Sequence, residues 1–266
     1  MYPPILRPPG LARFRAVPVL SALLLGLCGC QTDGLSDVTG SLGGDKPEKT
    51  TPARGLEFYQ ERHRANPADA EAALNYGKAL RASGQRSQAV AVLEQAVIAH
   101  PGDKALMAGY GRALADNGKF QQAFEVLGRA HSPEDPDWRI LSAQGAVLDQ
   151  LGRREEAQQY YASALRIVPD EPSVLSNLAL SYLLSKDLAK AEETLRRANS
   201  RADADPRVRL NLALVVGLRG RMAEAESLAK EGRPPEEAAA NVAYLRRMLA
   251  KQAAAKTTPG GGAHPD

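Results

Sequence analysis

The chain has 266 residues, of which 44% are hydrophobic, 24% are charged and only 5% are aromatic. This length allows one sizeable folded region with extensions, and the composition suits helices rich in alanine and leucine. The formal net charge is +3, but the basic excess lies within the first fifteen residues. Beyond that segment basic and acidic residues are equal in number. The rest of the chain therefore lacks the excess of basic residues that is typical of a nucleic-acid-binding protein.

The first 29 residues have the pattern of a targeting segment. Arg7, Arg13 and Arg15 occur there without any acidic residue, and an apolar run follows at residues 16–27. A basic start followed by a short apolar core is typical of a secretory signal peptide, and it is well below the roughly 20 residues that span a bilayer. We therefore predict that residues 1–29 are removed from the mature protein.

The apolar run ends in Leu27-Cys28-Gly29-Cys30. A leucine three places before a cysteine, with glycine directly before it, resembles the lipobox of bacterial lipoproteins. This resemblance implies that Cys30 becomes the lipidated first residue, so that no cysteine is left for a disulfide, a metal or a nucleophile. Gln31 is not the aspartate that resembles an inner-membrane retention signal, which favours the outer membrane, facing the periplasm. The alternative is a plain signal peptide or a short membrane anchor in which both cysteines are incidental.

Residues 30–53 are predicted to be a lipidated N-terminus and a flexible tether, because they are rich in Gly, Ser, Thr, Asp and Pro. From residue 54 to residue 65 the pattern becomes helical, and Pro67 follows it. This segment resembles the second half of a degraded repeat unit. It would cover the N-terminal end of the repeats that begin at residue 70.

From residue 70 onward one pattern returns every 34 residues. Three positions in each unit hold small residues: Gly77, Gly111, Gly145, Ala179 and Ala213; Ala89, Ala123, Ala157, Ala191 and Ala225; Ala96, Ala130, Ala164, Ala198 and Gly232. Between the first and second of these positions lies a fourth one, the breaker position, which divides each unit into two halves of helix length. It holds Gly84, Gly118, Gly152, Lys186 and Gly220. Units close at the same phase with Pro67, Pro101 and Pro169.

This pattern resembles the tetratricopeptide repeat (TPR), a helix-turn-helix unit with small residues at these positions. Small side chains let two antiparallel helices approach closely, while one such pair cannot bury its apolar face alone. We therefore predict an all-α fold, a right-handed TPR superhelix. It is a solenoid of about five helix-turn-helix repeats with an N-terminal half-repeat and a C-terminal capping helix.

The predicted solenoid covers residues 54–251. Its repeats occupy residues 70–103, 104–137, 138–171, 172–205 and 206–235, followed by a capping helix at 236–251. Pro133 and Pro136 shorten the second helix of the second unit. Residues 252–266 contain three consecutive glycines and are predicted to be a disordered tail.

Catalytic signals are missing from the sequence. The four histidines lack the HExxH spacing, no GxSxG motif occurs, and no glycine-rich loop follows a strand because no strand is expected. We therefore expect a protein that is not an enzyme and that has no cofactor, no metal, no small-molecule substrate and no nucleic-acid partner.

The concave surface of the solenoid is the predicted binding site for a protein. In TPR folds the first helix of each unit lines this surface, and an asparagine two residues before the first small position often contacts a bound peptide. The resemblance and the neighbouring positions give these candidates: Asn75, Lys78, Arg81, Arg112, Asn177, Leu180, Leu184, Asn211, Leu214 and Leu218. Basic residues mark the N-terminal half and leucines the C-terminal half, which suits a segment held by apolar anchors with charge setting its register. The alternative is that the leucines pack between units and the basic groups are merely solvated.

Two C-terminal stretches, Asn211–Glu226 and Pro234–Leu249, resemble the end of the TadD family of Flp (Tad) pilus assembly lipoproteins. Membership would imply an outer-membrane lipoprotein that helps the pilus secretin reach or assemble in that membrane, as a pilotin does. The expected function is thus a non-enzymatic assembly factor for a Flp-type pilus or related secretion machine, with a secretin or another envelope subunit as partner. The alternatives are a TPR lipoprotein scaffold in another process, such as barrel assembly or peptidoglycan synthesis, and an envelope enzyme with an unrecognised site.

Overall fold

The structure is a computed structural model that describes residues 52–201 and 205–257. This part of the chain forms twelve α-helices and no strand, as the repeat pattern predicts. The helices are α1 Pro52–Ala65, α2 Ala70–Ala82, α3 Arg86–Ala99, α4 Lys104–Asp116, α5 Phe120–Arg129, α6 Trp138–Gln150, α7 Arg154–Ile167, α8 Pro172–Leu184, α9 Leu188–Asn199, α10 Pro206–Leu218, α11 Met222–Lys230 and α12 Pro235–Thr257.

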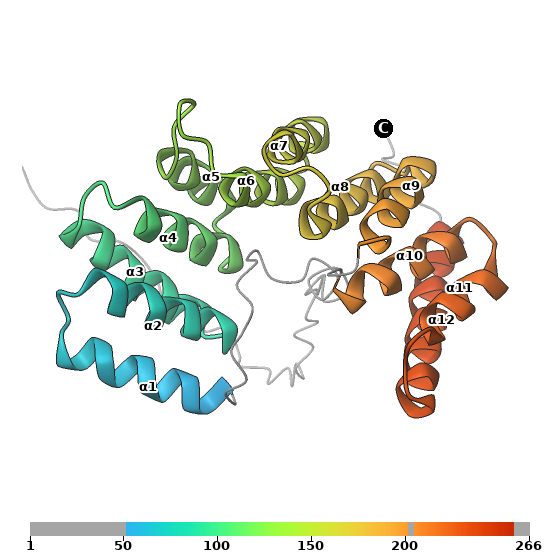
Figure 1. The fold of residues 1–266 in the computed structure, drawn as a ribbon, viewed down its shortest axis with the longest axis horizontal. Coiled ribbons are helices and arrows are strands. Elements are labelled where there is room, and N and C mark those ends of the chain that lie inside the picture. The colour runs from blue at the N-terminus through green and yellow to red at the C-terminus, as the bar shows by residue number, and fades with distance from the viewer. Residues whose placement is uncertain (1–51, 202–204, 258–266) are drawn as a thin grey trace, which may run out of the picture.

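The helices form a solenoid of stacked pairs that bends into an arch (Figure 1). Helices α2, α4, α6, α8 and α10 each pack on the helix that follows them in the chain, and each also contacts the next even-numbered helix. Among the described residues α3, α5, α7, α9 and α11 make no contact with one another. The even-numbered helices therefore line the inner, concave side of the arch, and the odd-numbered helices lie on its outer side.

Small residues bring the two helices of a unit together, as predicted. A Cβ added to Gly77 would lie 2.5 Å from Leu93 Cγ, and one added to Gly111 would lie 2.7 Å from Leu127 Cγ. The alanines at the second small position, from Ala89 to Ala225, are completely buried. Each helix pair is therefore fixed at a short separation, and any larger side chain at these positions would push the helices apart.

The turns and helix ends follow the same period. The breaker glycines have φ angles between 73° and 85°, a region that residues with a Cβ seldom adopt, and Lys186 takes the equivalent φ of 63° without being glycine. An acidic side chain caps each of α2, α4, α6, α8 and α10 by accepting hydrogen bonds from the first backbone N–H groups of the helix. These caps are Asp69, Asp103, Asp137, Glu171 and Asp205. Every unit thus starts with an anion at the positive end of a helix.

Helix bounds differ from the prediction at both ends of the solenoid. Helix α1 begins at Pro52 rather than at residue 54, because proline is favoured in the first turn of a helix. Helix α12 continues to Thr257, so residues 252–257 are helical and not part of a disordered tail. Alanine, glutamine and lysine there have high helix propensity, and the next proline is Pro259. The predicted signal peptide, the predicted lipidation at Cys30, the predicted tether up to residue 51 and the predicted tail from residue 258 lie outside the described residues.

Gly111→Ala tests the close helix contact. We expect a loss of about 1 to 3 kcal/mol of unfolding free energy, because the new methyl group would overlap Leu127, and a larger loss for Gly111→Leu. Gly128→Ala is the matched control, since its Cβ would meet only Gln144 Nε2 at 3.5 Å and alanine favours the helix. Urea unfolding measures both variants. Equal stability of the two Gly→Ala variants would show that the helix contact is misplaced.

Candidate protein-binding surface

The predicted basic candidates lie on the two inner helices at the N-terminal end of the arch. Arg81 Nε of α2 is 2.6 Å from Asp116 Oδ2 of α4, so this pair connects neighbouring units. Lys78 and Arg112 are half-buried, and both take part in interactions within the protein. The N-terminal half of the surface therefore carries three basic side chains, all of which already interact within the protein.

The predicted apolar candidates divide into two groups. Leu180 and Leu214 are only 5% and 7% exposed, so they belong to the core between units and do not present their side chains on the surface. Leu184 and Leu218 are half-buried, and Leu218 packs against the C-terminal core cluster with part of its side chain accessible. Leu180 and Leu214 thus fit the alternative prediction that the leucines pack between units. Leu184 and Leu218 are accessible enough to contact a partner.

The candidate asparagines hold neighbouring inner helices together. Asn177 Nδ2 of α8 donates to Ser142 Oγ of α6 at 3.3 Å. Asn211 Nδ2 of α10 donates in the same way to Ser176 Oγ of α8 at 3.4 Å. Asn75 has no earlier unit to reach and donates to Glu71 on its own helix. Each asparagine side chain therefore already has a hydrogen-bond partner within the protein.

A carboxyl group at the centre of the arch was not among the sequence candidates. Asp149 Oδ1 of α6 accepts a hydrogen bond from Ser181 Oγ of α8 at 2.7 Å, and Oδ2 accepts one from the hydroxyl of Tyr161 of α7 at 3.1 Å. Burial raises the pKa of Asp149 to about 6, although the hydroxyl hydrogen bonds and Arg154 act to lower it. Burial and the carboxyl together raise the pKa of the Tyr161 hydroxyl well above its ordinary value.

A second unpredicted cluster joins the fourth and fifth units on the outer side. Glu192 of α9 is buried and forms ion pairs with Arg196, Arg219 and Arg221. Burial acts to raise the pKa of Glu192, but the three guanidinium groups outweigh it and lower the pKa to about 2. Because Glu192 is surrounded by partners from its own chain, this cluster serves to hold α9 against the turn that precedes α11.

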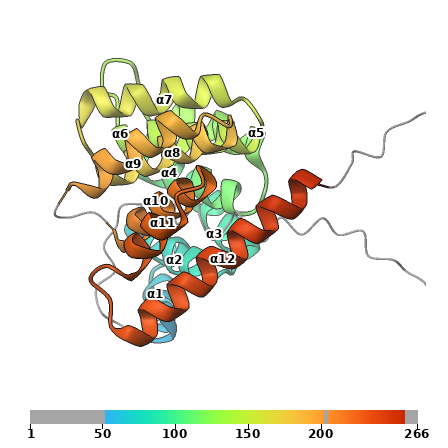
Figure 2. The ribbon, with the colours of Figure 1, turned by 90° about the vertical axis from the view of Figure 1, so that its right-hand side faces the viewer.

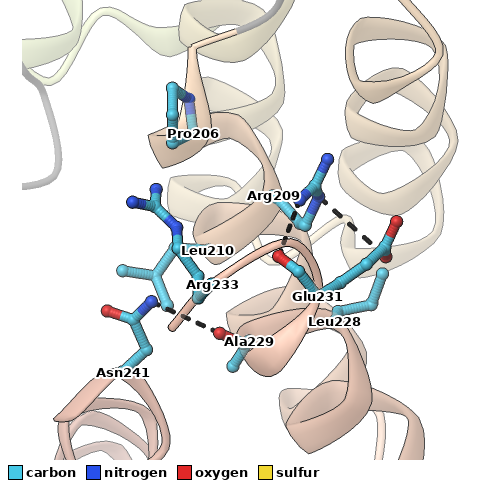
Figure 3. A pocket seen from close by; sticks show the side chains of 8 residues that line it. All are labelled: Pro206, Arg209, Leu210, Leu228, Ala229, Glu231, Arg233 and Asn241. Atoms are coloured by element: carbon cyan, nitrogen blue, oxygen red, sulfur yellow. Dashed lines mark hydrogen bonds and ion pairs between the residues drawn. The ribbon is translucent and has the colours of Figure 1, made fainter. Parts of the chain in front are cut away.

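Two hollows lie at the C-terminal end of the described residues. One lies between α10, α11 and α12 and encloses about 10 Å³, room for roughly one water molecule (Figure 3). A more open one beside it, of about 440 Å³, is lined by Asn199, Ser200, Arg201, Asp205, Pro206, Arg209, Gly232 and Arg233. The arginines at this end are engaged, since Arg209 Nη1 donates to the Glu231 carbonyl and Arg233 pairs with Glu237.

The histidines within the described residues have structural contacts. His63 stacks on Tyr76, His100 Nε2 lies 2.8 Å from the carbonyl oxygen of Ala68, and His131 Nε2 lies 3.0 Å from Gln144 Oε1. Across residues 52–201 and 205–257 no group of three or more His, Cys, Asp or Glu side chains is placed to hold a metal ion. The same part of the chain contains no helix with the length and hydropathy needed to cross a membrane.

The class of protein follows from this architecture of stacked helix pairs with a continuous inner surface. A family model of the tetratricopeptide repeat matches residues 80–145 and 150–215, and a second model of this repeat matches residues 206–236. These matches together span more than half of the sequence, so the chain belongs to the tetratricopeptide repeat family. The curated proteins include no significant match to the chain.

Solved structures share the fold at low sequence identity. The APC/C hetero-tetramer Cut9-Hcn1 has 17% identity and a TM-score of 0.62, and its match covers 79% of this chain and 41% of that chain. PilW, described as a widely conserved type IV pilus biogenesis factor, has 16% identity, a TM-score of 0.61 and coverages of 74% and 90%. TTC0263, a thermophilic TPR protein of Thermus thermophilus, has 23% identity, a TM-score of 0.58 and coverages of 70% and 100%. At these identities the likeness establishes the fold alone.

Asp149→Asn tests the buried carboxyl group. The pKa in the folded protein, about 6, exceeds its ordinary value of 3.8, so this group stabilises the fold below pH 4 and loses that contribution as pH rises through 6. The amide of the variant stays neutral at all these pH values. Between pH 4 and pH 7.5 the unfolding free energy of the wild type should therefore fall by about 1 to 2 kcal/mol relative to that of the variant. This value is smaller than the full pKa shift implies, because Asp149 is partly exposed to solvent. Urea unfolding of both proteins at several pH values measures this. Parallel pH profiles would contradict the raised pKa.

Proposed function

We propose that this chain is a non-enzymatic outer-membrane lipoprotein that acts as an assembly factor, similar to a pilotin, for a Flp/Tad pilus or a related secretion machine. The observation that carries the binding role is the inner surface of the TPR solenoid, since this fold presents a long concave face to protein segments. The partner is a secretin or another envelope subunit. The face suits an extended or helical segment with acidic groups toward α2 and α4 and apolar groups toward α8 and α10.

The charge of the inner helices supports this orientation of the partner. Lys78, Arg81 and Arg112 lie on α2 and α4, where Arg81 pairs with Asp116, and we assign the acidic groups of the partner segment to this half. Leu184 and Leu218 are partly accessible at the other half and supply apolar contact. Affinity would come from the leucines, while the basic residues set the direction in which the segment lies.

Two features of the sequence support the location and the process. The Leu27-Cys28-Gly29-Cys30 sequence resembles a lipobox, and acyl chains on Cys30 would hold the protein on the membrane because each buried methylene contributes about 0.8 kcal/mol. The Asn211–Glu226 and Pro234–Leu249 stretches resemble the TadD family. The fold shared with PilW, a type IV pilus biogenesis factor by its description, agrees with a role in pilus assembly.

Cys30→Ser tests the lipid anchor. We expect the variant to fold normally but to leave the outer-membrane fraction for the soluble periplasmic fraction, because the acyl chains are lost. Cys28→Ser is the matched control and should remain in the outer membrane, since Cys28 lies within the cleaved segment. Fractionation of cells with immunoblotting measures both variants. A Cys30→Ser protein that still sediments with the outer membrane would exclude lipidation at this residue.

Site-specific photocrosslinking in cells tests the partner and the surface together. A photoreactive amino acid at Leu184 or Leu218, on the inner helices, should capture a secretin or another pilus component, which mass spectrometry identifies. The control position is Ile98 on α3, which is 74% exposed on the outer side. Capture of barrel-assembly or cell-wall proteins would assign the chain to another envelope process. Equal capture from Ile98 would show that the inner surface is not the binding face.

A further inference from the structure

The two ends of the arch each lack one packing partner. Between the ends, every inner helix contacts the outer helix before it and the one after it, and every outer helix lies between two inner helices. Within residues 52–201 and 205–257, α1 packs on α2 alone, and α12 has an outer helix, α11, on one side only. Figure 2 shows α12 crossing the end of the stack beside α10 and α11. The stack therefore lacks an inner helix before α1 and an outer helix after α12.

Helix α1 keeps the residue pattern of an outer helix. Gly55 lies 34 residues before Ala89, which is a completely buried small residue of α3. Tyr59 lies 34 residues before Leu93, whose side chain packs on Gly77 of the inner helix in the same unit. The side of α1 with Gly55 and Tyr59 thus has the form that receives an inner helix in the other units.

An aromatic side chain is exposed on this side of α1. Phe58 is 55% exposed, whereas the residues at the same phase of later outer helices, Val92, Val126 and Leu228, are half-buried. The rings of Phe58 and Tyr59 contact each other edge to face, with centroids 5.3 Å apart. Covering these two rings would remove apolar surface from water and so stabilise a contact at this end.

Helix α12 has the matching pattern of an inner helix. Val242 and Leu245 are buried in the C-terminal apolar cluster, while Ala243 between them is exposed. The same order, an alanine after one buried bulky residue and two places before another, occurs in α10 at Leu212–Val215. There Ala213 is the small residue that faces the outer helix of its unit. Ala243 therefore presents the small position of an inner helix, and α12 has no outer helix on that side.

The charges at the two ends have opposite signs where these helices would meet. The two helices of a unit are antiparallel, so the start of α12 would lie beside the end of α1. Helix α12 begins with Glu236 and Glu237, and the last turn of α1 contains Arg62 and Arg64. All four side chains are exposed. A contact between the two ends would therefore bring carboxylates next to guanidinium groups, which favours this pairing and its direction.

We propose that copies of this chain associate head to tail, with α12 of one copy supplying the inner helix that α1 of the next copy lacks. Tyr59 then packs on Ala243 of the neighbouring copy, as Tyr161 packs on Gly145 within the third unit. One chain cannot make this contact with itself, because α1 and α12 lie at opposite ends of the arch (Figure 1). The contact is heterologous, so each copy keeps one open end to which a further copy adds.

Residues 30–51 of the same chain are a poorer match for the place beside α1. They contain four glycines and Pro47, whereas the missing element is a helix with a small residue that faces Tyr59. They also lack the two consecutive carboxylates that α12 places at its start. The second copy is therefore the occupant that fits both the packing and the charge of α1.

Disulfide bonds between copies test the contact. The whole chain, with Cys28 and Cys30 changed to serine and purified in detergent, carries Tyr59→Cys in one preparation and Ala243→Cys in another. The mixture should form a disulfide-linked dimer under mild oxidation, because helices at this separation bring the two residues within reach of each other. A chain with both substitutions should form a ladder of longer products on non-reducing electrophoresis.

The control mixture contains Ile98→Cys in place of Tyr59→Cys, since Ile98 is 74% exposed on α3 and lies at neither end. It should form little or no dimer. Equal dimer from Tyr59→Cys alone or from Ala243→Cys alone would show a symmetric pair and overturn the head-to-tail arrangement. A mixture of the two that stays monomeric would also overturn the proposal, and it is the result expected if residues 30–51 cover α1.

Phe58→Glu tests the same contact in a chain that keeps Tyr59 and Ala243. Sedimentation velocity of the chain without these cysteines should show a sedimentation coefficient that rises with protein concentration. Phe58→Glu should abolish this rise, because a carboxylate would be buried against the neighbouring copy. Ile98→Glu is the matched control, since it also replaces an exposed apolar residue of an outer helix, and it should keep the rise. The same concentration dependence in both variants would overturn the proposal.

Discussion

The close approach of two helices at a glycine is the constraint on which the rest of this structure depends. Gly77, Gly111 and Gly145 leave no room for a Cβ, because Leu93, Leu127 and Tyr161 occupy that space. The resulting pair has a fixed shape and an apolar face that only another pair can cover. Stacking, curvature and the need for end helices such as α1 and α12 all follow from this one contact. The shape of the inner surface is thus determined by helix packing, whatever the surface binds.

Periodicity was sufficient to predict the fold because each structural requirement recurs at the same place. The small residues, the breaker glycines and the two-helix units all lie where the 34-residue period places them. The acidic caps from Asp69 to Asp205 share that period and were available in the sequence as a further signal. Helix ends were less predictable, because the end of α12 depends on the local helix propensity of alanine and not on the repeat.

The candidate site was predictable only in part, because a period shows which side of a helix faces inward but not how far the neighbouring helix covers it. Leu180 and Leu184 were equivalent candidates in the sequence, yet only Leu180 is buried. Glu192 was missed since two of its three arginines, Arg219 and Arg221, come from the next unit, which no spacing rule connects to it. Asp149 had an indirect signal. Tyr161 occupies the position that holds leucine in the neighbouring units, and a buried hydroxyl requires a polar partner.

The internal hydrogen bonds of the inner surface limit how tightly a partner segment can bind. Asn177 and Asn211 already donate to serines, so a bound backbone would exchange one hydrogen bond for another and gain little net free energy. Affinity must then come from apolar surface, and only Leu184 and Leu218 of the four candidate leucines offer it. Binding also costs conformational entropy, because the partner segment becomes ordered. The inner surface should therefore bind a partner segment weakly, because internal hydrogen bonds and buried leucines leave little unsatisfied surface on it.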